Sequence, residues 1–282
     1  MPPVLVKTAF LFMLVGYGTK AALVPFHAWL PDVYSQAPMP ICALLSVVET
    51  TALPYVLVRL LPIFPGEASD GAGTWLVIFG LLSTGGAALL LVQVKDLKRL
   101  FAYSTIENAG MILTAAGLGG AAGYGSVYQL MTHALVKPFC FFAAGAVLLF
   151  AGTTEIAAVQ GLGRRSPMAG AALLAGALAA TGAPPFALFL SELSILRGGA
   201  MDHRLLVVAL LTLFIVAAFC AVTYHVTRMV FGKVSAAGPV PAFPSSYALA
   251  LVVAFLPVAA LGVSLPSPIE HLLRLAASTL AR

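Results

Sequence analysis

Residues 18–46 read Gly-Thr-Lys-Ala-Ala-Leu-Val-Pro-Phe-His-Ala-Trp-Leu-Pro-Asp-Val-Tyr-Ser-Gln-Ala-Pro-Met-Pro-Ile-Cys-Ala-Leu-Leu-Ser, and this stretch decides the fold. It places Lys20 near the end of an apolar run, Pro25 about one turn further on, and His27 beyond the proline. Ionisable side chains are costly inside hydrocarbon, so they usually line a polar pathway or contact a partner. A helix broken beside such a residue leaves carbonyls that water, protein or an ion must satisfy. The stretch therefore predicts a discontinuous membrane helix with polar side chains at its break.

The composition is that of an all-α integral membrane protein. The chain is 61% hydrophobic and 9% charged, and its mean hydropathy is +1.02. A soluble domain contains roughly 25% charged residues, so this chain cannot cover a globular surface with polar side chains. Its basic residues are scattered rather than aligned along one face, so the net charge of +5 predicts membrane topology and no nucleic-acid partner.

Eight apolar segments are long enough to cross a bilayer, which needs roughly 20 residues per helix. They are Val4–Leu23 (continuing brokenly to Leu30), Pro40–Leu61, Thr74–Val94, Leu97–Leu118, Ser126–Ala151, Met168–Leu196, Leu205–Phe231 and Tyr247–Val263. The sequence thus predicts one transmembrane helical bundle over residues 1–264. Residues 265–282 alternate apolar and charged side chains at helical spacing, which is typical of an interfacial amphipathic tail.

Basic residues in the short loops predict the orientation. Lys95-Asp96-Leu97-Lys98-Arg99 forms a charged turn between the third and fourth spans, and Arg164, Arg165 and Lys233 belong to the same side. Lysine and arginine favour the cytoplasm, so this side is expected there and both termini outside. Three cysteines, Cys42, Cys140 and Cys220, stand alone in apolar runs, which predicts buried thiols and no metal site.

Seven ionisable side chains lie at membrane depth once the loop charges are removed. They are Lys20, Glu49, Glu107, His133, Lys137, Glu192 and His225. A purely structural membrane protein tolerates few such groups, because each is expensive to bury. Their density indicates conduction of ions or protons. Of the seven, His225 lies near the end of its span and is interpreted as structural.

His133 and Lys137 are four residues apart, so they share one face of their helix. Pro138 disturbs the backbone hydrogen bonds where the lysine sits. The pair suits a proton relay, since both side chains can titrate when buried; the alternative is a structural contact with a carboxylate of another helix. Glu107 is either the counter-ion of Lys137 or a member of a polar packing cluster.

A second break is expected where Thr-Gly-Ala-Pro-Pro occupies residues 181–185, inside a long apolar span and just before Glu192. Two broken helices, each with an ionisable residue nearby, are the sequence pattern of an inverted-repeat transporter.

The residues around the first break leave alternatives open. Lys20 either faces the membrane interior or extends to the interface. Glu49 is either its carboxylate partner or a contact to another subunit. His27 either belongs to the pathway or is a hydrogen-bonded structural histidine beside Trp29.

Four motifs carry a resemblance that covers nearly the whole chain. They are Lys-Ala-Ala-Leu-Val-Pro-Phe-His-Ala-Trp-Leu-Pro-Asp (20–32), Ser-Gln-Ala-Pro (35–38), Asp-Leu-Lys-Arg-Leu-Phe-Ala-Tyr-Ser-Thr-Ile (96–106) and Met-Thr-His-Ala-Leu-Val-Lys (131–137). In combination they resemble the antiporter-like, proton-conducting subunits of respiratory complex I, Mrp antiporters and group-4 [NiFe] hydrogenases. Thr-Gly-Ala-Pro-Pro-Phe, followed by Ser-Glu-Leu (191–193), is most similar to the hydrogenase-4 or formate-hydrogenlyase branch.

The resemblance implies two inverted five-helix repeats, broken helices and a chain of buried basic and acidic residues along the membrane midplane. By position, Lys20 matches the lysine on the family's first broken helix. His133 and Lys137 match its central histidine and lysine, and Glu192 matches its terminal residue after the second broken helix. The family has roughly fourteen spans, and this chain begins at the position of the seventh.

Two departures from the family pattern follow. The glutamate that pairs with the first lysine falls in the part not represented, so another polypeptide supplies it, Glu49 replaces it, or the chain is a truncated or split form. Some relatives carry a lysine on the second span near Thr51, where this sequence has threonines and Glu49.

The resemblance implies a proton-translocating subunit of a redox-driven complex of the energy-converting hydrogenase or NADH:quinone oxidoreductase type. Such a subunit holds no redox centre, so no catalytic, cofactor-binding or metal-ligating residue is expected here. Iron–sulfur clusters and NiFe or flavin are expected in partner subunits. The expected partners are other membrane subunits, one of them supplying the missing N-terminal helices, and the lipid of a bacterial or archaeal cytoplasmic (inner) membrane. The alternatives are a subunit of an Mrp-type Na+/H+ antiporter and a non-conducting structural subunit.

Overall fold

The computed structural model describes residues 3–64, 67–233 and 243–280, and the regular structure of these residues is helical. The elements are α1 (Pro3–Lys20), α2 (Trp29–Gln36), α3 (Met39–Leu60), the short 3-10 helix η1 (Leu61–Ile63), α4 (Glu67–Val92), α5 (Leu97–Leu118), α6 (Gly120–Ala151), α7 (Leu162–Arg165), α8 (Pro167–Ala180), α9 (Ala187–Met201), α10 (Leu205–Phe231), α11 (Ser245–Val263) and α12 (Ser267–Leu280).

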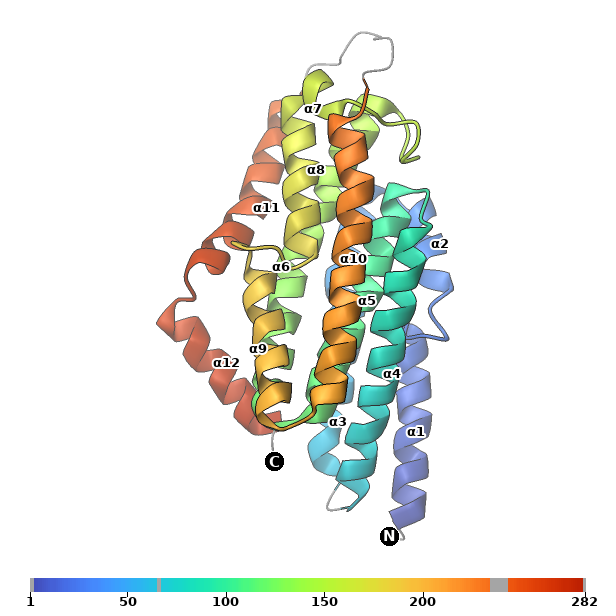
Figure 1. The fold of residues 1–282 in the computed structure, drawn as a ribbon, viewed down its shortest axis with the longest axis vertical. Coiled ribbons are helices and arrows are strands. Elements are labelled where there is room, and N and C mark those ends of the chain that lie inside the picture. The colour runs from blue at the N-terminus through green and yellow to red at the C-terminus, as the bar shows by residue number, and fades with distance from the viewer. Residues whose placement is uncertain (1–2, 65–66, 234–242, 281–282) are drawn as a thin grey trace.

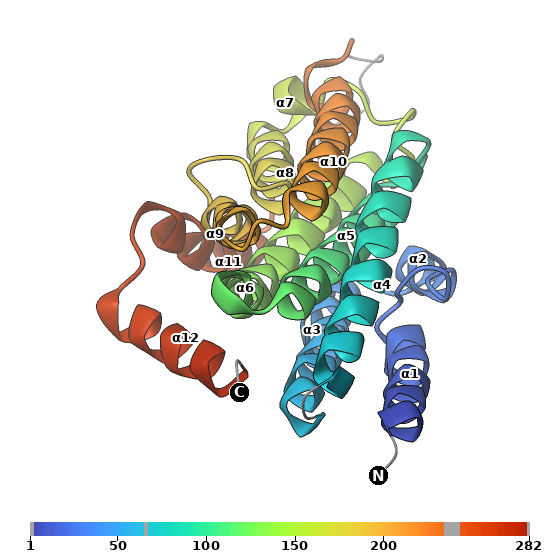
Figure 2. The ribbon, with the colours of Figure 1, turned by 60° about the horizontal axis from the view of Figure 1, so that its bottom comes forward.

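Helix α6 is the centre of the bundle. It packs against α3, α5, α8, α9, α11 and α12, and Figures 1 and 2 show these helices gathered around it. Helices α4 and α10 cover α5 on the opposite side from α11. Helix α1 lies at the edge, where it packs against α3 and α4. The helix with the sequence's His-Lys pair thus lies at the centre of the bundle, beside α5, most of whose residues are buried.

Five of the described helices are long and apolar enough to cross a membrane: α3 with η1, α4, α6, α10 and α11. Their limits follow the expected spans closely, although α4 begins at Glu67 and α6 at Gly120, earlier than predicted. Hydrophobicity marks where a helix enters lipid, whereas its hydrogen-bonded turns begin earlier. The expected count was eight. Helix α5 carries Lys98, Arg99 and Glu107, and α8 and α9 are individually short.

Both expected helix breaks are confirmed. Helix α1 ends at Lys20 and α2 begins at Trp29; α8 ends at Ala180 and α9 begins at Ala187. Within the second break, Gly182 has a φ of 64°, a left-handed conformation that glycine adopts without steric cost. Figure 1 shows that α1 and α8 enter the bundle from opposite ends.

Helix α12 folds back along the lower half of the bundle (Figure 1) and packs against α6. Leu273 is buried, and the Arg274 guanidinium lies over the Tyr124 ring, 5.5 Å from its centroid. The hydrogen bonds that Glu270 accepts from Arg274 raise the pKa of this arginine. The expected amphipathic tail is therefore helical over Ser267–Leu280, and residues 281–282 lie outside the described residues.

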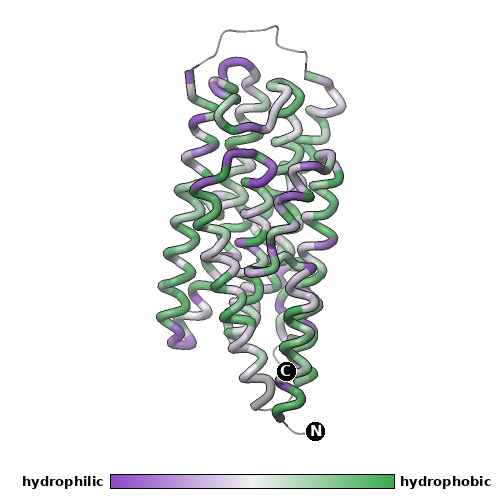
Figure 3. The backbone as a smooth tube through the Cα atoms, turned by 90° about the vertical axis from the view of Figure 1, so that its right-hand side faces the viewer, coloured by the Kyte–Doolittle hydropathy of each residue, from purple (hydrophilic) through white to green (hydrophobic). Residues whose placement is uncertain are grey.

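Hydrophobic residues run along most of the length of the helices, with hydrophilic stretches concentrated at the turns (Figure 3). Cys42 and Cys140 are buried as predicted. The prediction is wrong for Cys220, which is exposed. An apolar run does not say which side of a lipid-facing helix touches protein, and Cys220 lies on the outward side of α10.

Candidate functional site

Lys137 lies at the centre of the bundle, on α6, with 1% of its surface exposed. Its Nζ donates to the Ser104 Oγ at 2.8 Å and to the Phe101 carbonyl at 3.3 Å, both on α5. Pro138 is inside α6, which continues through it. The ammonium is therefore held by neutral oxygens, and a group held this way can gain or lose a proton without breaking an ion pair.

His133 lies one turn before Lys137 on α6 and is also buried. Its Nδ1 is 3.2 Å from the Thr51 Oγ1 of α3, and its Nε2 has no hydrogen-bond partner among the described residues. The imidazole thus joins α3 to α6 and keeps one nitrogen available for a proton. From the sequence, Thr51 stands out only as lying near the position where some relatives carry a lysine.

Glu107 faces the same region from α5, with 3% of its surface exposed. The described residues include no direct ion pair between Glu107 and Lys137. One carboxylate oxygen, Oε2, has no hydrogen-bond partner in the described part of the chain. Glu107 is therefore a buried carboxyl group without an ion-pair partner among the described residues.

Glu192 is buried on α9, on the second turn after the break. Its carboxylate lies directly against Gly182, and a Cβ at residue 182 would overlap it. The break therefore forms one wall of the carboxylate's surroundings. Gly182 accounts for both the chain's turn and the space for Glu192.

The first break is arranged differently. Lys20 Nζ forms an ion pair with Glu49 Oε1 of α3 at 3.1 Å, and 65% of the Lys20 side chain is exposed. An open groove of about 330 Å³ next to it is lined by Met13, Gly16, Tyr17, Lys20 and Leu53. The structure thus brings Lys20 and Glu49 together at the edge of the bundle.

His27 and His225 are placed apart from this line of residues. His27 lies in the first break, where the Trp29 Nε1 donates to the Thr19 carbonyl at 2.8 Å. The Nε2 of His225 is 3.1 Å from the Leu91 carbonyl of α4. That contact fits the interpretation of His225 as structural.

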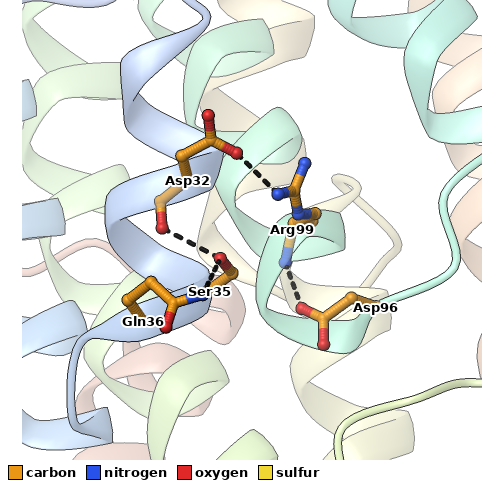
Figure 4. Close-up of polar contacts among 5 residues, drawn as sticks. All are labelled: Asp32, Ser35, Gln36, Asp96 and Arg99. Carbon is orange, nitrogen blue, oxygen red and sulfur yellow. Dashed lines mark hydrogen bonds and ion pairs between the residues drawn. The ribbon is translucent and has the colours of Figure 1, made fainter.

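A polar contact set joins α2 to the start of α5 (Figure 4). Arg99 donates to Asp32 at 2.5 Å, and the Asp96 side chain accepts from the Arg99 backbone N–H at 3.0 Å. The neighbouring Lys98, expected as a loop charge, is buried and donates to the Ser35 and Ala37 carbonyls at 3.0 and 2.8 Å. Lys98 thus satisfies carbonyls that the end of α2 leaves free.

His133, Lys137, Glu107 and Glu192 are all buried, and together they comprise bases and acids. Among the described residues, no group of three or more His, Cys, Asp or Glu side chains is close enough to hold a metal ion. The arrangement suits proton transfer between neighbouring groups whose charges influence each other.

Comparison with known proteins shows the family to which the chain belongs. The family model described as "NADH:quinone oxidoreductase/Mrp antiporter, TM" matches residues 4–220. A protein named hydrogenase-4 component F homolog, from Methylacidiphilum infernorum (isolate V4), is 38% identical over 233 residues, which cover 81% of this chain and 48% of that protein. The chain therefore spans about half the length of this curated relative.

Two solved structures share the fold. One is a chain of the membrane-bound sulfane sulfur reductase, an archaeal respiratory membrane complex, with a TM-score of 0.90 and 29% identity over 99% of this chain and 57% of that one. The other belongs to the Mrp complex from Dietzia sp. DQ12-45-1b, with a TM-score of 0.83 and 20% identity over 97% of this chain and 59% of that one. The chain is an integral membrane protein that belongs to the NADH:quinone oxidoreductase/Mrp antiporter transmembrane family.

Proposed function

We propose that this chain is a proton-translocating membrane subunit of a redox-driven complex of the energy-converting hydrogenase or NADH:quinone oxidoreductase type. It conducts protons in a bacterial or archaeal cytoplasmic membrane and holds no redox centre. Iron–sulfur clusters, with NiFe or flavin, belong to partner subunits. The observation that carries the proposal is the burial of four ionisable side chains in the bundle, His133, Lys137, Glu107 and Glu192, which we propose form a proton line.

Proton movement along this line follows from the charges of its members. A proton gained by one group lowers the proton affinity of its neighbour, so an incoming charge displaces the next one. The Lys137 Nζ donates to Ser104, and Ser104 and Glu107 are three residues apart on one face of α5. Electron transfer in a partner subunit would supply the first charge, and Glu192, beside the second break, would release the last proton.

The proposed topology has eight membrane passages and part of an inverted repeat. Helices α1 and α2 form one interrupted passage, and α8 and α9 form another. The two interrupted helices enter from opposite ends of the bundle (Figure 1), as equivalent elements of two inverted repeats would. The tail α12 lies at the interface in this arrangement.

The first break supplies the contact to another membrane subunit. On α1, Phe12 is 74% exposed, and Met13 and Tyr17 line the open groove beside Lys20. Exposed aromatic and apolar side chains on a membrane helix suit packing against further helices. A partner helix in this groove would enclose Lys20 and Glu49 and continue the polar line.

A second candidate is a subunit of an Mrp-type Na+/H+ antiporter, driven by ion gradients. The family model includes Mrp antiporters, and the fold matches the Mrp complex. The exposed Lys20–Glu49 pair is the feature that favours it, because a carboxylate that exchanges an ammonium for Na+ could bind the cation.

The test uses the purified native complex in sealed liposomes that contain a pH-sensitive dye. With H2 or NADH as electron donor, the redox-driven function predicts acidification that Lys137→Ala and Glu192→Gln lower by about a hundred-fold or more, as for loss of a group in a proton-transfer chain. Lys95→Ala, at an exposed lysine outside the bundle core, is the matched control and leaves the rate unchanged.

Three outcomes discriminate the functions. Acidification that requires an electron donor supports the redox-driven pump. Proton movement driven by a Na+ gradient without a donor supports the antiporter. Normal acidification in assembled Lys137→Ala and Glu192→Gln complexes contradicts both and leaves a non-conducting structural subunit.

A further inference from the structure

Four buried polar side chains without ionisable groups form a continuous set between α5, α6 and α9. They are Asn108 on α5, Gln129 and Thr132 on α6, and Ser191 on α9, and each has 0% of its surface exposed. We refer to these four residues as the polar clasp. Polar side chains inside a membrane bundle are retained where they join helices.

The contacts of the clasp run through Gln129. Its Nε2 donates to the Asn108 Oδ1 at 2.7 Å, and its Oε1 accepts from the Ser191 hydroxyl. One amide therefore uses its donor on α5 and its acceptor on α9. The Asn108 Nδ2 in turn donates to the Ser104 carbonyl at 2.8 Å, so the other end of the set is fixed to α5.

The two hydroxyls of the clasp also meet, with Thr132 Oγ1 3.0 Å from Ser191 Oγ. Ser191 has a single proton, and the Leu188 carbonyl is a second acceptor for it at 2.8 Å. When Ser191 donates to Gln129, Thr132 is the group that can donate to Ser191. The two hydroxyls can thus exchange donor and acceptor roles while each keeps a hydrogen-bond partner. Buried polar groups require such partners.

Three of the four members of the clasp are sequence neighbours of residues in the proposed proton line. Asn108 follows Glu107, Thr132 precedes His133, and Ser191 precedes Glu192. Gln129, His133 and Lys137 are spaced by four, so they share one face of α6. The clasp consequently joins the helices of Glu107, His133 and Glu192 through direct side-chain hydrogen bonds, in addition to the Lys137–Ser104 bond between α6 and α5.

Helix α9 needs such a fixing point more than its neighbours. It has 15 residues, and the break after Ala180 separates it from α8. A continuous span is held in position by packing along its whole length, whereas the shorter α9 depends on fewer contacts. Lipid provides no hydrophobic drive between helices, so packing and interhelical hydrogen bonds set its position.

We propose that the polar clasp positions α9, and with it the Glu192 carboxylate, relative to His133 and Lys137 on α6. The proposal rests on the proposed function, in which Glu192 receives protons from the central groups. Gln129 and Ser191 are positioning residues: they hold the distance over which the proton moves and take no proton themselves. A misplacement of about 1 Å can cost about a hundred-fold in rate.

The experiment uses the complete chain in its native complex, reconstituted in liposomes. Ser191→Ala and Gln129→Leu are expected to lower redox-driven acidification by about ten- to a hundred-fold. Ser194→Ala is the matched control, because Ser194 lies one turn further on the same helix and donates to the Leu190 carbonyl of its own helix. Thr132→Val is expected to lower the rate, and Thr132→Ser, which keeps the hydroxyl, to restore it.

Infrared spectroscopy gives a readout of position that does not depend on conduction. The carboxyl band lost in Glu192→Gln identifies Glu192, and this band is expected to shift in Ser191→Ala and Gln129→Leu but not in Ser194→Ala. Normal acidification in Glu192→Gln would contradict the proposed function while the band still tests the clasp. An unshifted Glu192 band in assembled Ser191→Ala complexes would overturn the proposal that the clasp positions Glu192. Equal acidification rates for Ser191→Ala and Ser194→Ala would overturn it as well.

Discussion

The two helix breaks place an ionisable side chain in opposite surroundings. At the first break, Lys20 is largely exposed and its ion pair with Glu49 borders an open groove. At the second, Glu192 is 6% exposed, Gly182 touches its carboxylate, and Gly262 of α11 lies against the Pro185 carbonyl. The Glu192 carboxylate is thus enclosed by this chain's own residues, although Pro184 and Pro185 of the break are exposed, whereas Lys20 lies at an open edge.

This difference separates two ways of building a membrane proton site. An enclosed carboxylate depends on close packing, because small changes in backbone position alter its distance to the next group. The burial and charge state of an ion pair at an open edge depend on whether a helix of another subunit covers it. Substitutions at the second break should therefore act within this chain, and substitutions at the first should act through assembly with another subunit.

Gly182→Ala should have the largest effect. An alanine at a φ of 64° is strained, and its Cβ would overlap the Glu192 carboxylate. We expect a loss of about 3 kcal/mol in unfolding free energy and acidification reduced by about a hundred-fold. Thermal unfolding of the purified complex and liposome acidification measure the two effects.

Gly16→Ala is the comparison for that variant at the first break. A Cβ there would meet nothing within 4 Å of this chain, and Gly16 is in the middle of α1. Helix propensity alone predicts a gain of about 1 kcal/mol. Unchanged acidification with normal assembly would show that the groove is open in the complex, and failed assembly would show that a partner helix fills it. A Gly182→Ala complex as stable and active as the Gly16→Ala complex would refute the contrast.

Gly262→Ala should rank second. The added Cβ would overlap the Pro185 carbonyl and the Phe186 backbone, so α11 would have to move away from the second break. Overpacking of this kind costs about 1–3 kcal/mol. Gly123→Ala, where a Cβ meets nothing within 4 Å, is the control. Equal unfolding temperatures for the two variants would contradict the close approach of α11.

Lys98→Met should destabilise the region after the first break to an intermediate extent. The ammonium satisfies the Ser35 and Ala37 carbonyls at the end of α2, and removing it leaves both without their donor. The expected cost is about 1–3 kcal/mol. Hydrogen exchange of α2 should increase in Lys98→Met and not in Lys95→Met, since Lys95 is exposed.

The fold could be predicted from the sequence where a local signal exists. Pro25 and the pair Pro184–Pro185 marked both breaks because proline removes a backbone hydrogen bond of a helix, although α6 continues through Pro138. Apolar length gave the position of most spans. The orientation of α1 against α8 and the central place of α6 depend on contacts between distant segments, which no local pattern reports.

The site was predictable to the extent that its residues are ionisable. Lys137, His133 and Glu192 stood out because charge is rare at membrane depth. Gln129, Thr132 and Ser191 carry no such signal, since neutral polar residues are common in membrane helices. Lys98 was assigned to a loop because its sequence neighbours are charged, and its burial depends on the carbonyls of α2, which lie far away in the sequence.

Glu49→Gln should have the smallest effect on stability, and it tests most directly how the first break differs from the second. The Lys20–Glu49 pair is partly exposed, and such pairs contribute about 0–1 kcal/mol, so the unfolding temperature of the isolated chain should barely change. If Glu49 is the carboxylate that serves Lys20, acidification should fall although stability does not. If a partner helix in the groove brings its own acid, Glu49→Gln should leave acidification intact and Lys20→Met should still lower it. The two variants together therefore decide whether the first break is completed by α3 of this chain or by a carboxylate from another subunit.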